Sequence, residues 1–225
     1  MNKKIRKIIN ILLISALSIC GWEVGKKQYK YIISFMKYEK IAQEKEKHKS
    51  VQEYLYNKDY DWIKVSDTAI NYPLVYTEDN QYYLTRDYEG NEDIAGAIYY
   101  DAIDKPYEGL STIIYGHSMR NGTMFNNLHY FPKDKERFKT SILTINTKQG
   151  ETRYKPIAYD IYNANEPYYR DIDKMNMNEA LNLLNNKCDY FIDDTEFNYD
   201  GHIIALVTCD YSIKDGRLVV FYVKE

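Results

Sequence analysis

Cysteine is scarce in this chain of 225 residues, and its scarcity excludes a disulfide-stabilised fold. Three cysteines are too few for the paired framework of a small secreted domain. Cys20 lies in an apolar run, and Cys188 follows a helix-like segment at residues 178–184, where a thiol is usually buried and unreactive. Cys209 is therefore the cysteine that remains free to act as a nucleophile.

Sequence signatures of metal, phosphate and nucleic-acid binding are also absent. No Cys/His spacing fits zinc, and no glycine-rich loop fits a phosphate group. Acidic residues gather at positions 87–93, but their spacing matches no EF-hand loop and is typical of a polar turn. The net charge of −3 gives no electrostatic basis for nucleic-acid binding. We therefore expect no metal, no cofactor and no nucleic-acid partner.

A single hydrophobic run is candidate membrane sequence, and it lies at the N-terminus. A basic cluster at residues 3–7 precedes an uncharged stretch at residues 8–22. This stretch is shorter than the about 20 residues of a full span, but Lys7 can snorkel and Trp22 suits an interface. No small-x-small pair precedes a cleavage point, so an uncleaved anchor is favoured over a signal peptide. The basic cluster predicts a single-pass protein of the cell membrane with an extracellular C-terminal part.

The chain divides into three parts: residues 1–25, 26–60 and 61–225. The first is the basic tip and anchor, and the second is a charged, helix-prone stalk with some residues at helical spacing for packing. The third contains short β-like runs broken by turns, which predict one barrel or sandwich, and the 25 tyrosines favour strands. These runs lie at residues 62–65, 69–72, 95–100, 110–115, 142–145, 154–162, 202–208 and 218–223. One amphipathic helix, at about residues 173–186, interrupts them.

Three side chains that could take part in catalysis lie where β-like runs meet loops: His117, Cys209 and Arg217. If Cys209 ends one strand and Arg217 opens its antiparallel neighbour, the two backbones lie about 5 Å apart. The guanidinium would then favour the thiolate, and its planar fork of donors could hold an oxyanion. His117 can protonate a departing amine and deprotonate an incoming one. The predicted chemistry is acyl transfer through a thioester.

Each of these residues, taken singly, has a commoner structural explanation. A lone cysteine is usually structural, a histidine at a strand end is usually a hydrogen-bonded polar residue, and an arginine after glycine is usually a surface charge. The other histidines carry less weight: His48 lies in a Lys/Glu run, His129 in a loop flanked by aromatics, and His202 at the start of a strand.

Several motifs in the right order resemble class B sortases, the membrane-anchored cysteine transpeptidases of Gram-positive bacteria. The resemblance runs from about residue 62 to the C-terminus and is implied by several segments together. Residues 113–125 resemble the histidine segment, 206–209 the T-L-x-T-C motif, 216–220 the arginine strand, and 71–75, 79–84 and 96–101 the upstream strands and turn. The resemblance implies a mainly β fold, a closed eight-stranded β-barrel with N-terminal helices and a helix inserted between strands six and seven.

The resemblance also implies an activity, that of a sortase-type cysteine transpeptidase and peptidase of the hydrolase class (EC 3.4.22-like). Cys209 would attack the carbonyl after threonine in the C-terminal sorting signal of a secreted protein. His117 would protonate the leaving amine, and Arg217 would bind substrate and steady the oxyanion. An amine of a peptidoglycan precursor would then resolve the thioester and leave the protein anchored to the cell wall. The implied signals are Asn-Pro-x-Thr-Asn-like or Pro-x-Thr-Gly-like.

Substrate contacts and departures from the family pattern follow from the same resemblance. Ala205 replaces the first threonine of T-L-x-T-C, and Ser118 stands where asparagine is common. Some descriptions of the family propose an aspartate two residues after the cysteine, but Tyr211 occupies that position here. A Cys–His–Arg site is therefore preferred over a triad that uses Asp210. For the paired tyrosines, packing on a β surface is a competing explanation. The implied substrate-binding residues are Asn80, Leu84, Tyr168, Tyr169, Thr208 and Asp210.

Three alternatives compete with wall anchoring. The same chemistry could polymerise pilin subunits, with a lysine side chain as the incoming amine. An L,D-transpeptidase is disfavoured, because its histidine and cysteine lie in one motif whereas His117 and Cys209 are far apart. An inactive, membrane-tethered domain that only binds sorting peptides would have little reason to keep all three reactive side chains.

Overall fold

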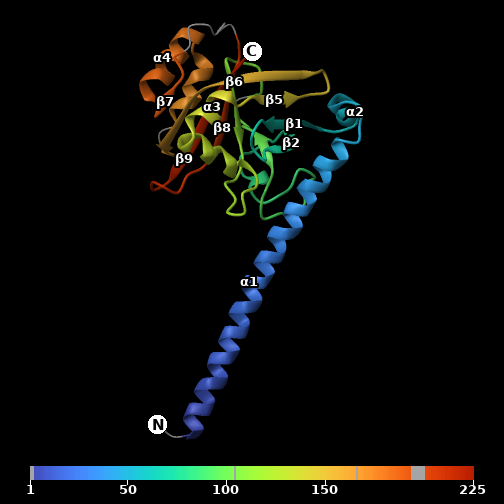
Figure 1. Ribbon diagram of the computed structural model, residues 1–225, viewed down its shortest axis with the longest axis vertical. Coiled ribbons are helices and arrows are strands. Elements are labelled where there is room, and N and C mark those ends of the chain that lie inside the picture. The colour runs from blue at the N-terminus through green and yellow to red at the C-terminus, as the bar shows by residue number, and fades with distance from the viewer. Residues whose placement is uncertain (1–2, 104, 166, 194–200) are drawn as a thin grey trace.

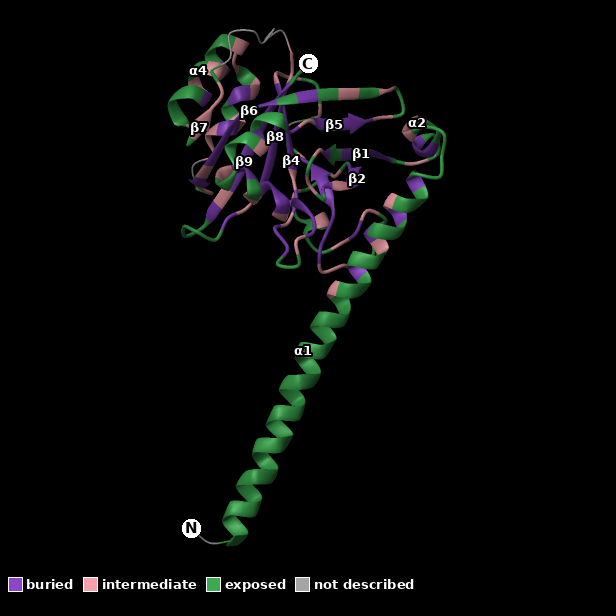
Figure 2. Cartoon of the chain, in the orientation of Figure 1, coloured by how far each residue is buried: buried purple, intermediate pink, exposed green. Residues whose placement is uncertain are grey.

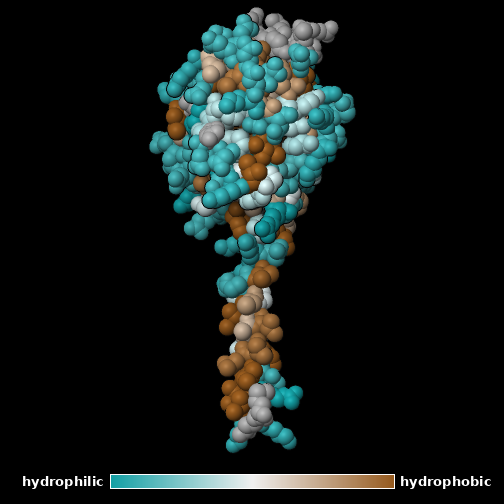
Figure 3. Space-filling view, turned by 90° about the vertical axis from the view of Figure 1, so that its left-hand side faces the viewer, coloured by the Kyte–Doolittle hydropathy of each residue, from teal (hydrophilic) through white to brown (hydrophobic). Residues whose placement is uncertain are grey.

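A single long helix, α1 (Lys3–Lys45), projects from the body of the protein (Figure 1). The computed structural model describes residues 3–103, 105–165, 167–193 and 201–225. An 18-residue window of α1 has a mean hydropathy of 1.8, and none of it is buried. The apolar side chains gather on the part of α1 farthest from the body (Figure 3). By length and composition this helix is able to cross a membrane, and it runs without a break into the segment expected to be a stalk.

The C-terminal part of α1 packs against the body, as the buried residues near its end show in Figure 2. These residues recur every three or four positions, so they form one stripe on the helix. A short second helix, α2 (Val51–Leu55), follows and is capped by Ser50, whose side chain accepts a hydrogen bond from the backbone N–H of Glu53. The buried residues of α1 are Ser34, Tyr38, Ile41 and Lys45.

The body is a closed β-barrel. Its strands follow one another in the order β5-β1-β2-β3-β4-β8-β9-β6, and β6 pairs with β5 to close the ring of eight. Neighbours are antiparallel except β2–β3 and β4–β8, which are parallel. The eight-stranded barrel expected from the sequence is therefore confirmed, and each predicted β run overlaps one strand. The strands are β1 (Tyr60–Val65), β2 (Asn71–Val75), β3 (Ile98–Tyr100), β4 (Ser111–Tyr115), β5 (Leu143–Asn146), β6 (Glu151–Asn163), β8 (Ile203–Cys209) and β9 (Gly216–Lys224).

An insert between β6 and β8 covers one outer face of the barrel. It contains η3 (Tyr168–Lys174), α4 (Met177–Lys187) and the two-residue strand β7 (Tyr190–Phe191), which pairs with β6. The helix predicted at residues 173–186 is confirmed, but its first turn begins later than expected. Asn176 and Glu179 form a capping box that starts α4, and the preceding residues form a separate 3-10 helix.

Two hydrophobic cores lie on either side of strand β8. On β8, Ile204 and Leu206 belong to the core inside the barrel, whereas Ile203, Ala205 and Val207 belong to the core under the insert. Side chains alternate between the faces of a strand, so β8 is buried on both sides. This double burial fixes the position of Cys209 at its end. The remaining helices are η1 (Tyr82–Leu84), η2 (Phe125–Lys133) and α3 (Lys135–Thr140).

Candidate active site

Adjacent strand ends bring His117, Cys209 and Arg217 together. Cys209 is the last residue of β8 and lies directly opposite Arg217 of β9 in an antiparallel register, as the sequence predicted. Strand β4 is parallel to β8 with Tyr115 opposite Val207, and each chain continues two residues further to His117 and Cys209. The three side chains therefore project from the same end of three neighbouring strands.

A pocket of about 270 Å³ lies at this end of the barrel. Its walls include all three of these residues, and three of the six residues implied as substrate contacts also line it: Asn80, Leu84 and Thr208. Cys209 is partly buried, so its thiol borders the pocket without being freely exposed. The other lining residues are Tyr99, Tyr115, Gly116, Arg170 and Val207.

The imidazole of His117 is oriented by a backbone carbonyl. Its Nε2 lies 2.8 Å from the carbonyl oxygen of Leu84. A carbonyl can only accept, which assigns the proton of the neutral ring to Nε2. Nδ1 then carries the lone pair, and it is the nitrogen that can take up or release a proton during a reaction. A carbonyl thus supplies the orientation that a carboxylate supplies in many triads.

The other two residues of the trio are held by short local contacts. The hydroxyl of Thr208 donates to the carbonyl of Gly116 at 2.8 Å, which ties β8 to β4 one residue before Cys209 and His117. Arg217 donates from Nη1 to the carbonyl of Gly216 at 2.9 Å. Arg217 forms no salt bridge with any residue in the described ranges. Its positive charge is therefore not neutralised by protein and can stabilise an anion in the pocket.

A second guanidinium, Arg170 of η3, reaches the pocket and was not identified from the sequence. It donates from Nη2 to Asp101 at 2.5 Å and to the hydroxyl of Tyr115 at 2.7 Å. Burial alone would raise the pKa of Asp101, but bonds from Arg170 and the backbone N–H of Ile103 outweigh it and hold that pKa below its usual value. Asp101 therefore stays ionised. No local motif marks this pair, because its members lie far apart in the sequence.

Asp101 also fixes the implied substrate contact Asn80. The amide nitrogen of Asn80 donates to Asp101 at 3.2 Å, and its amide oxygen accepts from the backbone N–H of Ala102 at 2.9 Å. Both ends of the Asn80 amide are thus engaged by protein. The side chain is held in one orientation at the pocket wall, which is the condition for reading a substrate selectively.

Tyr168, Tyr169 and Asp210 are not among the residues that line the pocket. The hydroxyl of Tyr168 donates to Asp160 at 2.9 Å, and Tyr169 is 5% exposed in the core under the insert. In this structure both tyrosines pack on the barrel, and contact with a substrate stays a prediction for them.

Asp210 instead anchors the loop between β8 and β9. One carboxylate oxygen accepts from the backbone N–H of Ser212 at 2.7 Å, and the other lies 3.2 Å from Nε2 of His129 on η2. Nδ1 of His129 lies 3.0 Å from the carbonyl of Asn126. Sequence analysis assigned no role to His129, because His129 and Asp210 meet only in the folded chain. Together they brace the loop that separates Cys209 from Arg217.

The described residues around this site do not form a metal centre. Within the ranges that the structure describes, no three His, Cys, Asp or Glu side chains are grouped so that they could hold a metal ion. Of the acidic residues at positions 87–93, Asp87 and Asp93 form ion pairs with Lys37 of α1. The arrangement suits nucleophilic catalysis by a thiol, with a proton carrier and a cation beside it.

Comparisons with known proteins identify the family. The sortase domain model matches residues 63–224. Sortase B of Listeria monocytogenes is 27% identical over 235 residues, covering 95% of this chain and 94% of the relative. The crystal structure of Staphylococcus aureus sortase B is 25% identical with a TM-score of 0.69, covering 84% of this chain and 97% of that one. A class B sortase of Streptococcus pyogenes involved in pilus biogenesis is 28% identical with a TM-score of 0.66, covering 77% and 96%. The chain belongs to the sortase family of cysteine transpeptidases, in class B.

Proposed function

We propose that this protein is a membrane-anchored transpeptidase that cleaves C-terminal sorting signals after threonine and transfers the secreted protein to an amine of a peptidoglycan precursor. The observation that carries the proposal is the pocket that His117, Cys209 and Arg217 line together. Asn-Pro-x-Thr-Asn-like and Pro-x-Thr-Gly-like signals are the candidate substrates. Cleavage by water in place of the amine would make the same enzyme a thiol peptidase.

The first half-reaction forms a thioester. The sulfur of Cys209 attacks the carbonyl carbon after threonine, while the thiol proton passes to Nδ1 of His117 when the thiol is the resting form. The carbonyl oxygen becomes an oxyanion that Arg217 stabilises by charge and hydrogen bonds. The C–N bond then breaks as the protonated His117 gives its proton to the departing amine. The acyl group remains bound to sulfur.

The second half-reaction transfers the acyl group. The incoming amine attacks the thioester carbon, and Nδ1 of His117 accepts the proton that the amine loses. The C–S bond breaks, the thiolate of Cys209 departs, and a new amide forms. One site thus serves both steps, because the leaving and attacking amines use the same proton carrier.

The proposed location follows from α1 and its flanking charges. The apolar part of α1 anchors the protein in the cell membrane, and the basic residues before it stay in the cytoplasm. The barrel then lies outside, where secreted proteins and wall precursors meet it.

Pilin polymerisation is the second candidate function. It is favoured by one observation, the likeness to the Streptococcus pyogenes class B sortase that is involved in pilus biogenesis. In that case a lysine side chain of a neighbouring subunit replaces the wall precursor as the amine, and the chemistry at Cys209 is unchanged.

The test is intact-mass analysis of the full chain in detergent micelles, mixed with a library of sorting peptides. We expect a thioester adduct on Cys209 that disappears when an amine is added, and no adduct with Cys209→Ala. Short oligopeptide amines and lysine-containing pilin peptides, offered in turn, separate wall anchoring from polymerisation. If an alkylating probe labels Cys209 but no peptide forms an adduct, the proposed substrates are wrong. If Cys209 is not labelled, a peptide-binding protein without activity replaces the enzyme.

A further inference from the structure

The two ends of one loop, residues 85–96, lie next to the imidazole of His117. Directly before the loop, the carbonyl of Leu84 accepts the hydrogen bond from Nε2 of His117. At the other end, Gly96 has a φ of +62°, and a Cβ there would lie 3.1 Å from Cδ2 of His117 and 2.4 Å from the carbonyl oxygen of Tyr83. Gly96 therefore lies against the imidazole, and a side chain at this position would crowd the ring.

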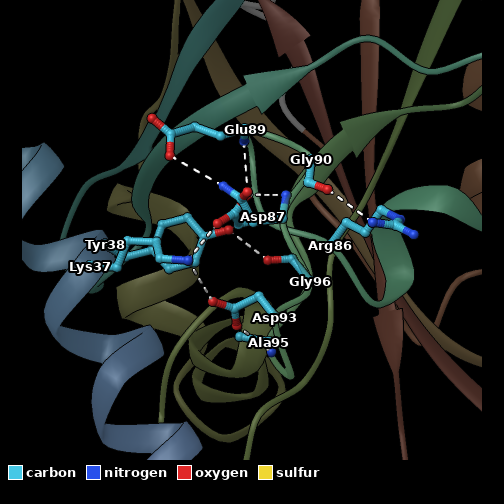
Figure 4. Close-up of polar contacts among 10 residues, drawn as sticks. Lys37, Tyr38, Arg86, Asp87, Glu89, Gly90, Asp93, Ala95 and Gly96 are labelled. Carbon is cyan, nitrogen blue, oxygen red and sulfur yellow. Dashed lines mark hydrogen bonds and ion pairs between the residues drawn. The ribbon is translucent and has the colours of Figure 1, made fainter.

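Helix α1 holds the loop in the middle and at one end (Figure 4). The Lys37 ammonium forms an ion pair with Asp87, whose side chain is fully buried, and another with Asp93 at 3.3 Å. The next residue, Tyr38, is 4% exposed and donates from its hydroxyl to the carbonyl of Gly96 at 2.6 Å. Two consecutive residues of the helix thus reach the same loop.

The two carboxylates link the lysine to the backbone of the loop. Each uses Oδ2 for Lys37 and Oδ1 for backbone N–H groups. Oδ1 of Asp87 accepts from Glu89 at 3.0 Å and from Asn91 at 2.9 Å, and Oδ1 of Asp93 accepts from Ala95 at 2.9 Å. Without the ammonium, both carboxylates would be free to rotate. Their hydrogen bonds to the backbone N–H groups of the loop would then weaken, and the loop would lose its fixed shape.

The charges of this cluster are stable at neutral pH. Burial alone would raise the pKa of Asp87, but bonds from Lys37 and from the backbone N–H of Asn91 outweigh it and keep that pKa below its usual value. Burial would lower the pKa of Lys37, yet Asp87 and Asp93 together raise it. Lysine and carboxylate each hold the other in its ionised form, so the contact persists over the physiological pH range.

We propose that Lys37 and Tyr38 are positioning residues, through which α1 keeps His117 in the orientation and tautomer that catalysis needs. The catalytic consequence of this positioning role rests on the proposed function, whereas its effect on the tautomer of His117 does not. The anchor helix is then part of the active site's support, and a change in α1 is felt at the imidazole through Leu84 and Gly96. A stabilising ion pair without this link would affect only the folding equilibrium.

The experiment uses the full chain in detergent micelles and compares Lys37→Met with Lys40→Met. Lys40 is exposed, lies three residues further along the same helix and forms no salt bridge with a described residue. Nitrogen-15 spectra of the four histidines report the tautomer of each ring, and His117→Gln assigns the signal. We expect wild type and Lys40→Met to show His117 with its proton on Nε2. In Lys37→Met we expect mixed tautomers and a kcat for peptide cleavage about ten-fold lower.

A milder variant covers the case in which Lys37→Met fails to fold. Tyr38→Phe removes only the hydroxyl that binds Gly96 and leaves both carboxylates paired. We expect the same change of the His117 signal with a few-fold fall in kcat, in line with the loss of one hydrogen bond. Tyr29→Phe is the matched control, because Tyr29 is an exposed tyrosine of the same helix.

The outcomes separate this proposal from the proposed function. A His117 signal that stays unchanged in folded Lys37→Met and Tyr38→Phe overturns the positioning role, whatever happens to kcat. A shifted signal in these variants, with normal spectra in both controls, supports it. If wild type cleaves no peptide, the proposed function fails, and the histidine spectra still decide whether α1 positions His117.

Discussion

The two arginines that line the pocket differ in whether a carboxylate pairs with them. Arg217, at the start of β9, stands opposite Cys209 and forms no salt bridge within the described part of the chain. Arg170, in the insert, is paired with the buried Asp101. The two guanidinium groups therefore suit different roles. The charge of Arg217 has no salt bridge with a described residue, as its proposed oxyanion role requires, whereas the charge of Arg170 is paired and fixes the pocket wall. A charge in an active site is informative only together with its partner.

The largest expected effect comes from Arg217→Lys. Lysine keeps the charge but loses the planar fork of donors, so we expect kcat for peptide cleavage to fall about 100-fold or more with little change in the unfolding temperature. Steady-state kinetics and thermal unfolding of the same preparations measure both. Near-wild-type turnover would show that charge alone suffices and would remove the oxyanion role.

Arg170→Met should act in the opposite way, on stability first. It leaves the carboxylate of Asp101 buried without its guanidinium, and we expect a loss of roughly 1–3 kcal/mol in the free energy of unfolding. Asn80 loses its fixed neighbour, so KM for the peptide should rise more than kcat falls. In Arg170→Met/Asp101→Asn the stability should largely return, as chemical denaturation would show. Equal instability of the single and double variants would mean that the pair is not the cause.

Acid should distinguish the two arginines as well. The pKa of Asp101 is held below its usual value, so the carboxylate stabilises the fold above the unfolded pKa of about 3.9 and loses this contribution as pH falls through the folded value. We expect the unfolding temperature to drop below about pH 4, and to drop less steeply in Asp101→Asn. Arg217→Lys, with no paired carboxylate, should follow the wild-type curve. Parallel curves for wild type and Asp101→Asn would contradict the assignment.

The smallest effect is expected for Tyr168→Phe, which tests a residue outside the pocket lining. Its hydroxyl donates to Asp160, and its loss should cost about 1 kcal/mol of stability. With packing as the only role, KM for the peptide stays unchanged. A raised KM in a variant of near-normal stability would instead support the substrate contact that the family resemblance implies.

The sequence predicted what depends on local patterns. The β runs, the closed barrel and the convergence of His117, Cys209 and Arg217 follow from alternation, strand ends and family motifs. It did not predict Arg170 with Asp101 or His129 with Asp210, since each pair joins segments that only the barrel brings together. The acidic positions 87–93 do form a turn, but nothing local shows that their carboxylates bind Lys37. Polar pairs between distant segments produce no periodic pattern in the sequence, so they cannot be predicted from it.

With α1 in the membrane as proposed, its unbroken course would set the height of the proposed active site above the bilayer. His117 shares a second hollow of about 690 Å³ with residues of α1 that include Val24 and Tyr31. Tyr31 lies nine residues after Trp22, and a helical rise of about 1.5 Å per residue places it about 14 Å along the axis. With Trp22 at the membrane interface, as the sequence leads us to expect, the proposed active site would lie at the level of the lipid headgroups. The distance of the scissile bond from the membrane would then limit which substrates are cleaved. A substrate whose scissile bond lies far above the bilayer could not enter the pocket, because the helix that holds the barrel is short and rigid.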